Sequence, residues 1–436
     1  MLYCVPTRFR QVDIWTPSEG KRHLGFKVNK KAQEPSHGLN AAERFVYELS
    51  HRSFLALWSY ANPRREIAGK ELCDVLVVCS PYVIIISAKE IRLGEARASS
   101  VEFERWRRRA IEESVKQLYG AERNIRSAVH VVRSDNSSGL PFPPTNEARI
   151  HRVAVAIGSK GIVPLSFGDF GKGFVHVFDE TAFHLVLSEL DTIEDFVQYL
   201  SAKEQFCRRV KALVQTREED LLAVYLHGGR RFPDPPDVLV TPDYLWETIQ
   251  KKPEYQNKKR ADKISYVWDR LIQRFAKDVL SGNLEPGASP TSAELGLRTM
   301  ARENRFSRRI LGGAFKEVLD ESRRTSLARM LEAPSGVIYV FFAAPRDYDR
   351  QVRQAELANR CFVARGLHPS STTVIGIATE RYEPEGFSLD LCQLCLPRWT
   401  PEHQREMAAM QTELGYFVSP RKTVSHEDEY PETTGT

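Results

Sequence analysis

The clearest hydrophobic pattern in the first half of the chain is a pair of short, almost uninterrupted apolar runs. They span Leu72 to Cys79 and Tyr82 to Lys89, and only Ser80-Pro81 separates them. Continuous apolar runs of this length, bounded by turn residues, are typical of strands that are buried on both faces. The pattern predicts a β-hairpin that reverses direction at the Ser-Pro pair.

Helical spacing flanks this hairpin on both sides. Asn40, with Glu43 three residues later, forms a capping-box pattern that begins a helix running through about Ser50. After the hairpin, apolar and small residues recur every three or four positions between Glu102 and Ile125, which predicts one long amphipathic helix. With a following strand at Arg152 to Ile157, this order indicates a mixed α/β domain.

The rest of the chain continues to alternate between the two kinds of pattern. Short apolar runs predict strands, and a period of three to four residues predicts helices. The predicted strands are 128–132, 173–178, 221–226, 336–343, 372–378 and 387–396, and the predicted helices are 181–190, 193–215, 243–282, 305–331, 348–365 and 401–414.

Changes in composition suggest how the chain divides. Asn283 to Pro290 is rich in Pro and Gly and predicts a linker. The last residues are mainly Ser, Thr, Pro and Glu, a composition typical of disorder. We expect an irregular lead-in at 1–39, an α/β domain with an extension at 40–215, a mixed, mainly helical middle region at 216–331, an α/β module at 332–419 and a disordered tail at 420–436.

Composition narrows the class of protein without naming an activity. The 436 residues are 42% hydrophobic and 27% charged, as in ordinary globular proteins. The apolar runs fall far short of the ~20 residues that cross a bilayer, so we expect no membrane span. Seven cysteines, an odd number, suit reduced thiols in the cytoplasm. A net charge of +5 permits nucleic-acid binding only where basic residues cluster.

The candidate chemistry lies in the predicted hairpin, where two charged residues interrupt apolar runs. Asp74 lies near the start of the first strand and Lys89 at the end of the second. Buried charges are costly unless something compensates them. A carboxylate facing a lysine, with the hydrogen-bonding residue Ser87 two positions before the lysine on the same strand face, can hold Mg²⁺ and leave the ammonium free to orient a water molecule.

Three pieces of sequence carry a resemblance to a known family. They are Glu43 in the first helix, Gly69-Lys70-Glu71-Leu72-Cys73-Asp74, and Ile86-Ser87-Ala88-Lys89. This stretch resembles the PD-(D/E)XK, or restriction-endonuclease-like, nuclease superfamily. Its Lys-Glu-Leu-Cys-Asp…Ser-x-Lys motif is similar to that of an uncharacterised group of bacterial proteins. The resemblance implies an α-β-β-β-α-β core over roughly 40–160, within a mixed α/β chain that has a helical middle region and a carboxy-terminal α/β module.

The resemblance also implies roles for individual residues. Asp74 and Glu43 would hold Mg²⁺ or Mn²⁺ together with the Ala88 carbonyl, and Lys89 would orient the attacking water. Gln117, on the long helix, would face the site as in the Mrr-like and VSR-like branches. Ser87 stands where the family usually has Glu, Asp or Gln, so either another acid replaces the missing carboxylate or activity is lost.

Each of these residues also has a structural interpretation. Asp74 and Lys89 could form a buried ion pair without catalysis. Glu43 could only complete the capping box, and Gln117 could be a solvated helix residue. The basic run Arg105, Arg107, Arg108 and Arg109 could contact phosphates or simply form a solvated face. Cys392-x-x-Cys395 lacks a second ligand pair at zinc spacing.

We therefore expect a cytoplasmic, Mg²⁺- or Mn²⁺-dependent nuclease that hydrolyses phosphodiesters, of DNA in preference to RNA. The resemblance alone implies a setting such as prokaryotic antiviral defence. The carboxy-terminal module could support a homo-oligomer or bind a protein partner. The alternative is a catalytically degenerate nuclease fold that serves as a nucleic-acid or protein interaction module.

Overall fold

The computed structural model describes residues 3–7, 39–66, 69–92, 100–159, 167–214, 216–284, 289–381, 388–418 and 427–431. The fold is mixed α/β, as the sequence predicts. The chain forms two compact units. One, here called the six-stranded unit, comprises 38–263, 301–305 and 428–436; the other, the five-stranded unit, comprises 1–37, 264–300 and 306–427.

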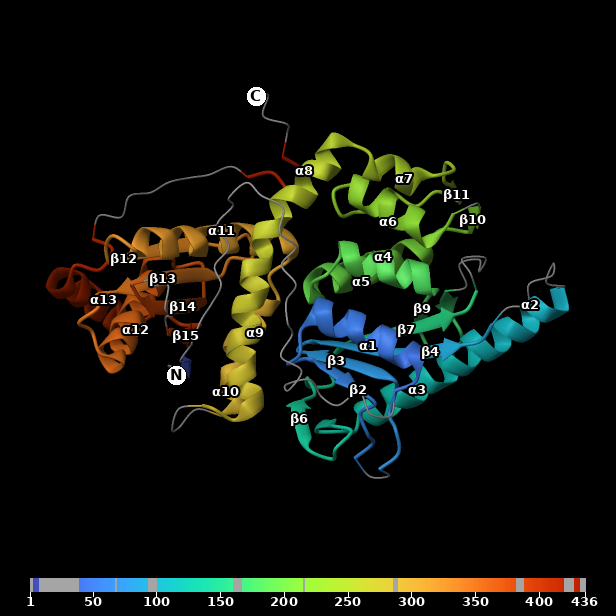
Figure 1. Cartoon of the computed structure of the whole chain (residues 1–436), viewed down its shortest axis with the longest axis horizontal. Helices are drawn as coiled ribbons and strands as arrows, with labels where there is room; N and C mark the ends of the chain where they lie inside the picture. The colour runs from blue at the N-terminus through green and yellow to red at the C-terminus, as the bar shows by residue number, and fades with distance from the viewer. Residues whose placement is uncertain are drawn as a thin grey trace, which may run out of the picture. The chain divides into compact units, whose positions relative to one another are not determined.

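The six-stranded unit is built on one mixed sheet (Figure 1). Its strands, in spatial order, are β2 (Ser59–Ala61), β3 (Val75–Cys79), β4 (Tyr82–Glu90), β7 (Arg149–Ile157), β9 (Phe174–Phe178) and β8 (Gly168–Asp169). β2, β3 and β4 are antiparallel, whereas β4, β7 and β9 run parallel. β3 and β4 are buried almost throughout, so the apolar hairpin predicted from the sequence is confirmed.

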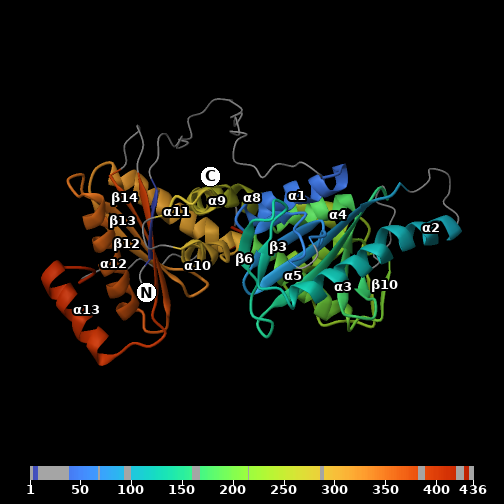
Figure 2. The same cartoon turned by 90° about the horizontal axis from the view of Figure 1, so that it is seen from below.

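Helices cover both faces of this sheet (Figure 2). α1 (Ala41–Phe54) and α4 (Glu180–Glu189), with α5 (Ile193–Cys207), lie on one face. The other face carries α2 (Ser100–Arg107), a π-helical turn η1 (Arg108–Glu112) and α3 (Glu113–Ile125). The predicted long helix is therefore present, and the π-helical turn interrupts its regular period.

The remainder of this unit is mostly helical and corrects two predictions. Its elements are β5 (His130–Val132), β6 (Ser138–Pro141), β10 (Ala212–Val214), α6 (Glu218–His227), β11 (Val238–Val240), α7 (Leu245–Gln250) and α8 (Pro253–Ala261). The strand predicted at 221–226 is wrong, because this apolar run lies within α6. The helix predicted to reach 215 ends at Cys207.

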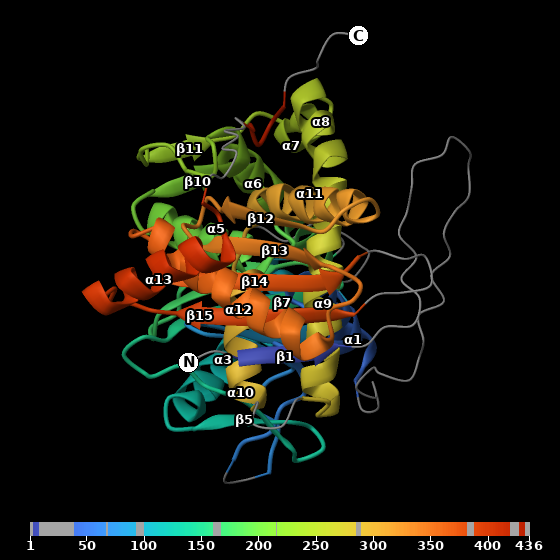
Figure 3. The same cartoon turned by 90° about the vertical axis from the view of Figure 1, so that its left-hand side faces the viewer.

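The five-stranded unit contains the second sheet (Figure 3). Its strand order is β1 (Tyr3–Thr7), β15 (Leu389–Cys395), β14 (Thr373–Glu380), β13 (Ile338–Ala344) and β12 (Leu327–Glu332). β13 and β14 are parallel and are joined by α12 (Arg350–Leu367). The other helices are α9 (Tyr266–Ser281), α10 (Pro290–Ala301), α11 (Arg305–Ser322) and α13 (Pro401–Leu414), with a 3-10 turn η2 (Asp262–Ser265) before α9.

Strand pairing accounts for the differences from prediction in this unit. The helix predicted through 331 ends at Ser322, because 327–332 pairs with β13 as β12. Residues 3–7 of the predicted lead-in pair with β15. Residues 8–38, 285–288 of the predicted linker, 419, and 420–426 and 432–436 of the predicted tail lie outside the described residues.

The observed units divide the chain differently from the five predicted segments. The predicted middle region, 216–331, contributes to both units. Part of the predicted tail belongs to the six-stranded unit, where Glu429 accepts hydrogen bonds from Arg230. Among the helices that the structure describes, none combines the length and the apolar character that a bilayer crossing needs.

Candidate functional site

The candidate site lies at the open end of the β3–β4 hairpin. Asp74 directly precedes β3, and because Val75 is paired with Ile86, it lies beside residues 87 and 88 of β4. Its side chain is only 2% exposed. The carboxylate is held in place by the Ala88 N–H, which donates to Asp74 Oδ2 at 2.5 Å. Strand pairing thus brings together two of the residues predicted from sequence.

The backbone of Ala88 also presents an oxygen toward the same side. Ile91 N–H donates to the Ile157 carbonyl of β7, and successive residues of a strand direct their backbone groups to alternate sides. The N–H and the carbonyl of Ala88 therefore both face away from β7. Since that N–H binds Asp74, the carbonyl lies on the Asp74 side of the strand.

Gln117 connects α3 to this carboxylate. Its Nε2 donates to Asp74 Oδ1 at 3.2 Å, and its Oε1 accepts the Ser87 hydroxyl at 3.0 Å. Because Ser87 donates to the amide oxygen, the amide nitrogen is left to face Asp74. Ser87 therefore orients Gln117, and the structure brings Gln117 into the site as the family resemblance implies.

Glu71 is a residue to which the sequence patterns assign no role. Its carboxyl hydrogen-bonds to the side chain of Asp74, and both Glu43 and Lys89 are close enough to act on its charge. The pKa of Glu71 rises to about 7, first through desolvation and then through the hydrogen bond and negative charge of Asp74. A carboxyl group whose pKa is raised by burial and by an adjacent acid is typical of functional sites.

Glu43 has the capping role that its spacing predicts. Its backbone N–H donates to Asn40 Oδ1 at 2.9 Å, and its carboxylate accepts from the Asn40 N–H at 3.1 Å and from Asn40 Nδ2 at 2.5 Å. The negative charge of Glu43 still contributes to the raised pKa of Glu71. Glu43 is thus close enough to the site to act on the charge of Glu71, while its carboxylate oxygens accept hydrogen bonds from Asn40 at the start of α1.

Lys89 supplies positive charge at the same place. It lies two residues after Ser87, on the same face of β4, and is partly exposed. Its charge opposes the rise in the pKa of Glu71. Within the described parts of the chain, its ammonium forms no ion pair, so it is available to a negatively charged ligand.

Cys73 is adjacent to this site but is not a nucleophile. It is fully buried, and burial together with the negative charges of Asp74 and Glu71 raises the pKa of its thiol well above the ordinary value. The reactive form of cysteine is the thiolate. Covalent chemistry at Cys73 is therefore disfavoured, which leaves oxygen ligands and an ammonium as the chemistry of the site.

The oxygen donors of this site suit a hard divalent cation that takes only two or three of its ligands from the protein. Over the described ranges, no group of three or more His, Cys, Asp or Glu side chains is arranged to hold an ion. Mg²⁺, however, commonly binds through one or two carboxylates and keeps several water molecules. Asp74, Glu71 and the Ala88 carbonyl match that requirement.

In the basic run at 105–109, one arginine is held in ion pairs and the others are exposed. Arg107 pairs with Glu104 and with Glu112, each at 3.1 Å. Trp106 is buried, and its Nε1 donates to the Ile91 carbonyl at the end of β4. The exposed members of the run are Arg105, Arg108 and Arg109. Contact with phosphate stays a prediction for these three.

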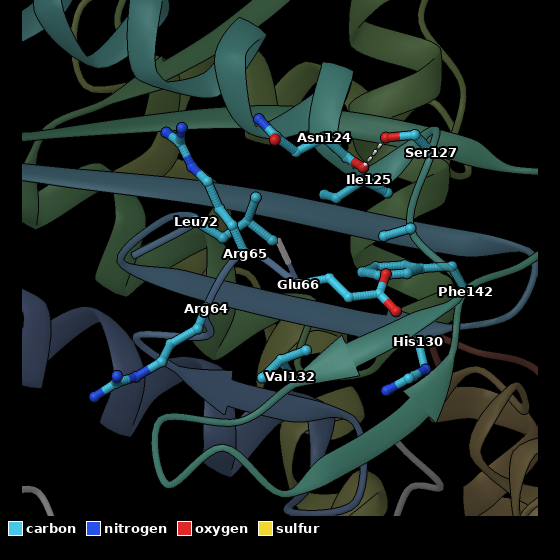
Figure 4. A pocket seen from close by; sticks show the side chains of 11 residues that line it. Arg64, Arg65, Glu66, Leu72, Asn124, Ile125, Ser127, His130, Val132 and Phe142 are labelled. Atoms are coloured by element: carbon cyan, nitrogen blue, oxygen red, sulfur yellow. Dashed lines mark hydrogen bonds between the residues drawn. The ribbon is translucent and has the colours of Figure 1, made fainter. Parts of the chain in front are cut away.

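A pocket of about 280 Å³ adjoins the loop that carries Glu71 and Asp74. Leu72, between the two acids, forms part of its wall. Figure 4 shows the Glu66 carboxylate beside the Phe142 ring, whereas the Arg64 side chain extends away from both. The pocket is also lined by Asn124 of α3, seven residues beyond Gln117 and hence about 10 Å further along the helix. The pocket therefore shares Leu72 with the loop of the two acids, but neither Glu71 nor Asp74 is among its lining residues.

Comparisons with known proteins were made at the level of family models, curated sequences and solved structures. None of the three finds a match for this chain. The site must therefore be interpreted from its own geometry.

Proposed function

We propose that this chain is a Mg²⁺- or Mn²⁺-dependent nuclease with a restriction-endonuclease-like core, acting on DNA in preference to RNA. The order of elements supports the fold. α1, the strands β2, β3 and β4, the helix formed by α2 and α3, and β7 follow the order α-β-β-β-α-β, with β4 and β7 parallel. The strands β5 and β6, which lie between α3 and β7 in the chain, form a separate hairpin outside this sheet. Prokaryotic antiviral defence is a setting that fits such an enzyme.

The observation that carries the proposal is the contact between two carboxyl groups beside an ammonium that has no ion-pair partner among the described residues. Asp74 and Glu71 hydrogen-bond to each other, with Lys89 close by. Asp74 accepts hydrogen bonds from the Ala88 N–H and the Gln117 amide, which are neutral donors. The second carboxyl group beside it adds negative charge that these donors do not compensate and that a divalent cation would relieve.

The chain's residues can then be given roles. Asp74 and Glu71 would hold the cation with the Ala88 carbonyl, while Gln117 fixes the orientation of Asp74. The cation would neutralise charge on the scissile phosphate. Lys89 would stabilise the negative charge that develops on the phosphate oxygens and orient the attacking water.

Metal dependence is the first expected result. Purified protein incubated with labelled DNA should cleave it in Mg²⁺ or Mn²⁺, lose cleavage in excess EDTA and regain it when the metal is restored, because Lys89 alone cannot compensate the two acids and a phosphate. Gel analysis of the products measures this. Cleavage that persists unchanged in EDTA would falsify the proposal.

Glu71 and Glu43 are expected to behave differently when each is changed to Gln. Glu71→Gln removes a charge in contact with Asp74 and should lower cleavage by about 10- to 100-fold at limiting Mn²⁺. Glu43→Gln keeps a side chain that can complete the capping box and should retain most activity and thermal stability. Single-turnover rates across a Mn²⁺ series compare the two variants. The reverse ranking would make Glu43 the metal ligand.

The catalytically degenerate module remains the second candidate, and Ser87 favours it. Its hydroxyl bonds Gln117 at the position where the family usually carries an acid. Calorimetric titration with Mn²⁺ separates the candidates, because a degenerate module would bind nucleic acid with no detectable Mn²⁺ site. The nuclease requires a Mn²⁺ site that Asp74→Asn weakens.

A further inference from the structure

A second pocket, of about 430 Å³, lies on the outer side of α3. One wall is formed by helix residues spaced three or four apart, and the other by the turn between β8 and β9. Its lining includes the side chains of Lys116, Tyr119 and Arg123 from the helix and Phe170 and Lys172 from the turn. The pocket thus lies between a regular helix and a short loop.

The turn is held firmly against the helix. Asp169 Oδ1 accepts from the N–H groups of Gly171 at 2.7 Å and Gly173 at 3.0 Å. The hydroxyl of Tyr119 donates to the Gly173 carbonyl at 2.6 Å. Gly171 has a φ of +104°, which side chains other than glycine rarely adopt. Phe170 and Lys172 are therefore presented at a fixed distance from α3.

The charge around this pocket is uncompensated. Lys116, Arg123 and Lys172 are exposed, and within the described part of the chain none of them forms an ion pair or a hydrogen bond. The one acid that lines the pocket, Glu112, is already paired with Arg107.

Two further acids of the same elements already have partners. Glu122 pairs with Arg126 and Arg152, and Asp169 binds the backbone of the turn. Three exposed cations along one pocket favour a ligand that carries several separated negative charges.

The pocket and the candidate active site use different faces of the same stretch of α3. Lys116 precedes Gln117, the residue that donates to Asp74. Lys116 and Arg123 are seven residues apart, about 10 Å along α3, so they are too far apart to bind one phosphate together. Gly120 lies between them, and nothing lies within 4 Å of where its Cβ would be. A chain of phosphates can therefore pass over α3 without meeting a side chain at that point.

Aromatic surface determines which polyanion fits. Tyr119 and Phe170 are partly exposed in the pocket, and among the described rings Phe170 stacks on none. Unpaired bases stack on such rings, whereas the bases of a duplex stack on one another. An anionic peptide or membrane would use the charges but would leave the ring without a partner.

We propose that this pocket binds a single-stranded segment of nucleic acid, with phosphates on Lys116, Arg123 and Lys172 and an unpaired base on Phe170. The inference rests on the proposed function, because it takes the strand to be the substrate of the Asp74 site. The proposed enzyme therefore acts on single strands or on duplexes with single-stranded ends.

Binding without cleavage tests the charged part of the proposal. In excess EDTA, fluorescence anisotropy measures the affinity of a labelled single-stranded oligonucleotide at several salt concentrations. The pair Lys116→Gln, Lys172→Gln should reduce the slope of log K against log salt by about 1.4, or about 0.7 for each phosphate of a single strand that is no longer neutralised. The control pair Lys251→Gln, Lys252→Gln removes the same charge from exposed positions after α7 and should leave the slope unchanged. Equal reductions of the slope in the two pairs would overturn the site.

The aromatic part has its own test. Phe170→Ala should weaken binding of the single strand by about tenfold, because one base no longer stacks on a ring, and should leave binding of a blunt duplex unchanged. An equal effect on the duplex, or no effect on either, would overturn the single-strand assignment. Preferred binding of an acidic peptide would also overturn it.

The two proposals fail separately. Loss of affinity in these variants without any metal-dependent cleavage by the wild type refutes the nuclease and keeps a single-strand binding module. Cleavage that depends on Asp74 and metal, with affinity unchanged in the variants, refutes this inference alone.

Discussion

Asp74→Asn is expected to lower metal-dependent cleavage by about a thousandfold or more while the protein remains folded. The variant loses the charge that would hold a divalent cation, and charge stabilisation worth several kcal/mol corresponds to this factor. An Asn oxygen can still accept the Ala88 N–H, which preserves the closure of the hairpin. Single-turnover cleavage and a thermal melt, measured on the same preparation, check both parts.

A matched change elsewhere in the same unit serves as the control. Asp179 caps α4 by accepting the Ala182 N–H at 2.8 Å, and Asn is an equally good cap. Asp179→Asn should therefore leave cleavage unchanged. Near-normal cleavage by folded Asp74→Asn would show that the site assignment is wrong.

The six-stranded unit is expected to lose stability steeply as the pH falls from 6.5 to 4, because it buries two neutral histidines. His151 on β7 and His176 on β9 have ring centroids 6.3 Å apart, and their ring nitrogens have no hydrogen-bond partner among the described residues. Burial lowers the pKa of His151 to about 4, helped by Arg152 and Arg149. Burial also lowers the pKa of His176, with Lys203 adding to the effect.

The direction of this change in stability with pH follows from proton binding by the two histidines. Between pH 4 and 6.5 the unfolded chain binds a proton at each histidine that the folded chain does not bind, so the free energy of unfolding falls as the pH falls. His151 alone accounts for a loss of about 3 kcal/mol at pH 4. Denaturant unfolding at several pH values should show a flatter dependence for His151→Phe. His184→Gln, which removes an exposed histidine of α4, should keep the wild-type slope; flattening in both variants would contradict the explanation.

Local patterns determined which parts of the fold could be predicted. The hairpin of β3 and β4 was predictable because apolar runs and an intervening turn lie next to each other in sequence. The run at 221–226 was misassigned because a short apolar run does not distinguish a strand from a buried helix. β1 depends on a partner strand about 390 residues away, so its own residues gave little indication of pairing. β12 forms a local hairpin with β13, but its residues also fit the period of the preceding helix, so the end of that helix was placed too late.

The same distinction applies to the candidate site. Asp74 and Lys89 were noticeable as charges within apolar runs, and a family resemblance placed Gln117 nearby. Glu71 lies in an irregular segment, where a spacing of three residues has no fixed geometry. Only the path of the loop between Asn62 and Asp74 brings its carboxyl to Asp74. An exposed Glu three residues before a buried Asp is the one signal that could have identified it.

The pairing of β1 with β15 has a consequence for synthesis of the protein. Tyr3 is opposite Gln393, so the ribosome releases the first strand long before its partner exists. At 5 to 20 residues per second, the interval is roughly 20 to 80 s. An unpaired strand can add to the sheet edge of another chain during that time. Residues 38–263, made in the interval, can meanwhile fold around their own sheet, so the sheet that begins first is the last to be completed.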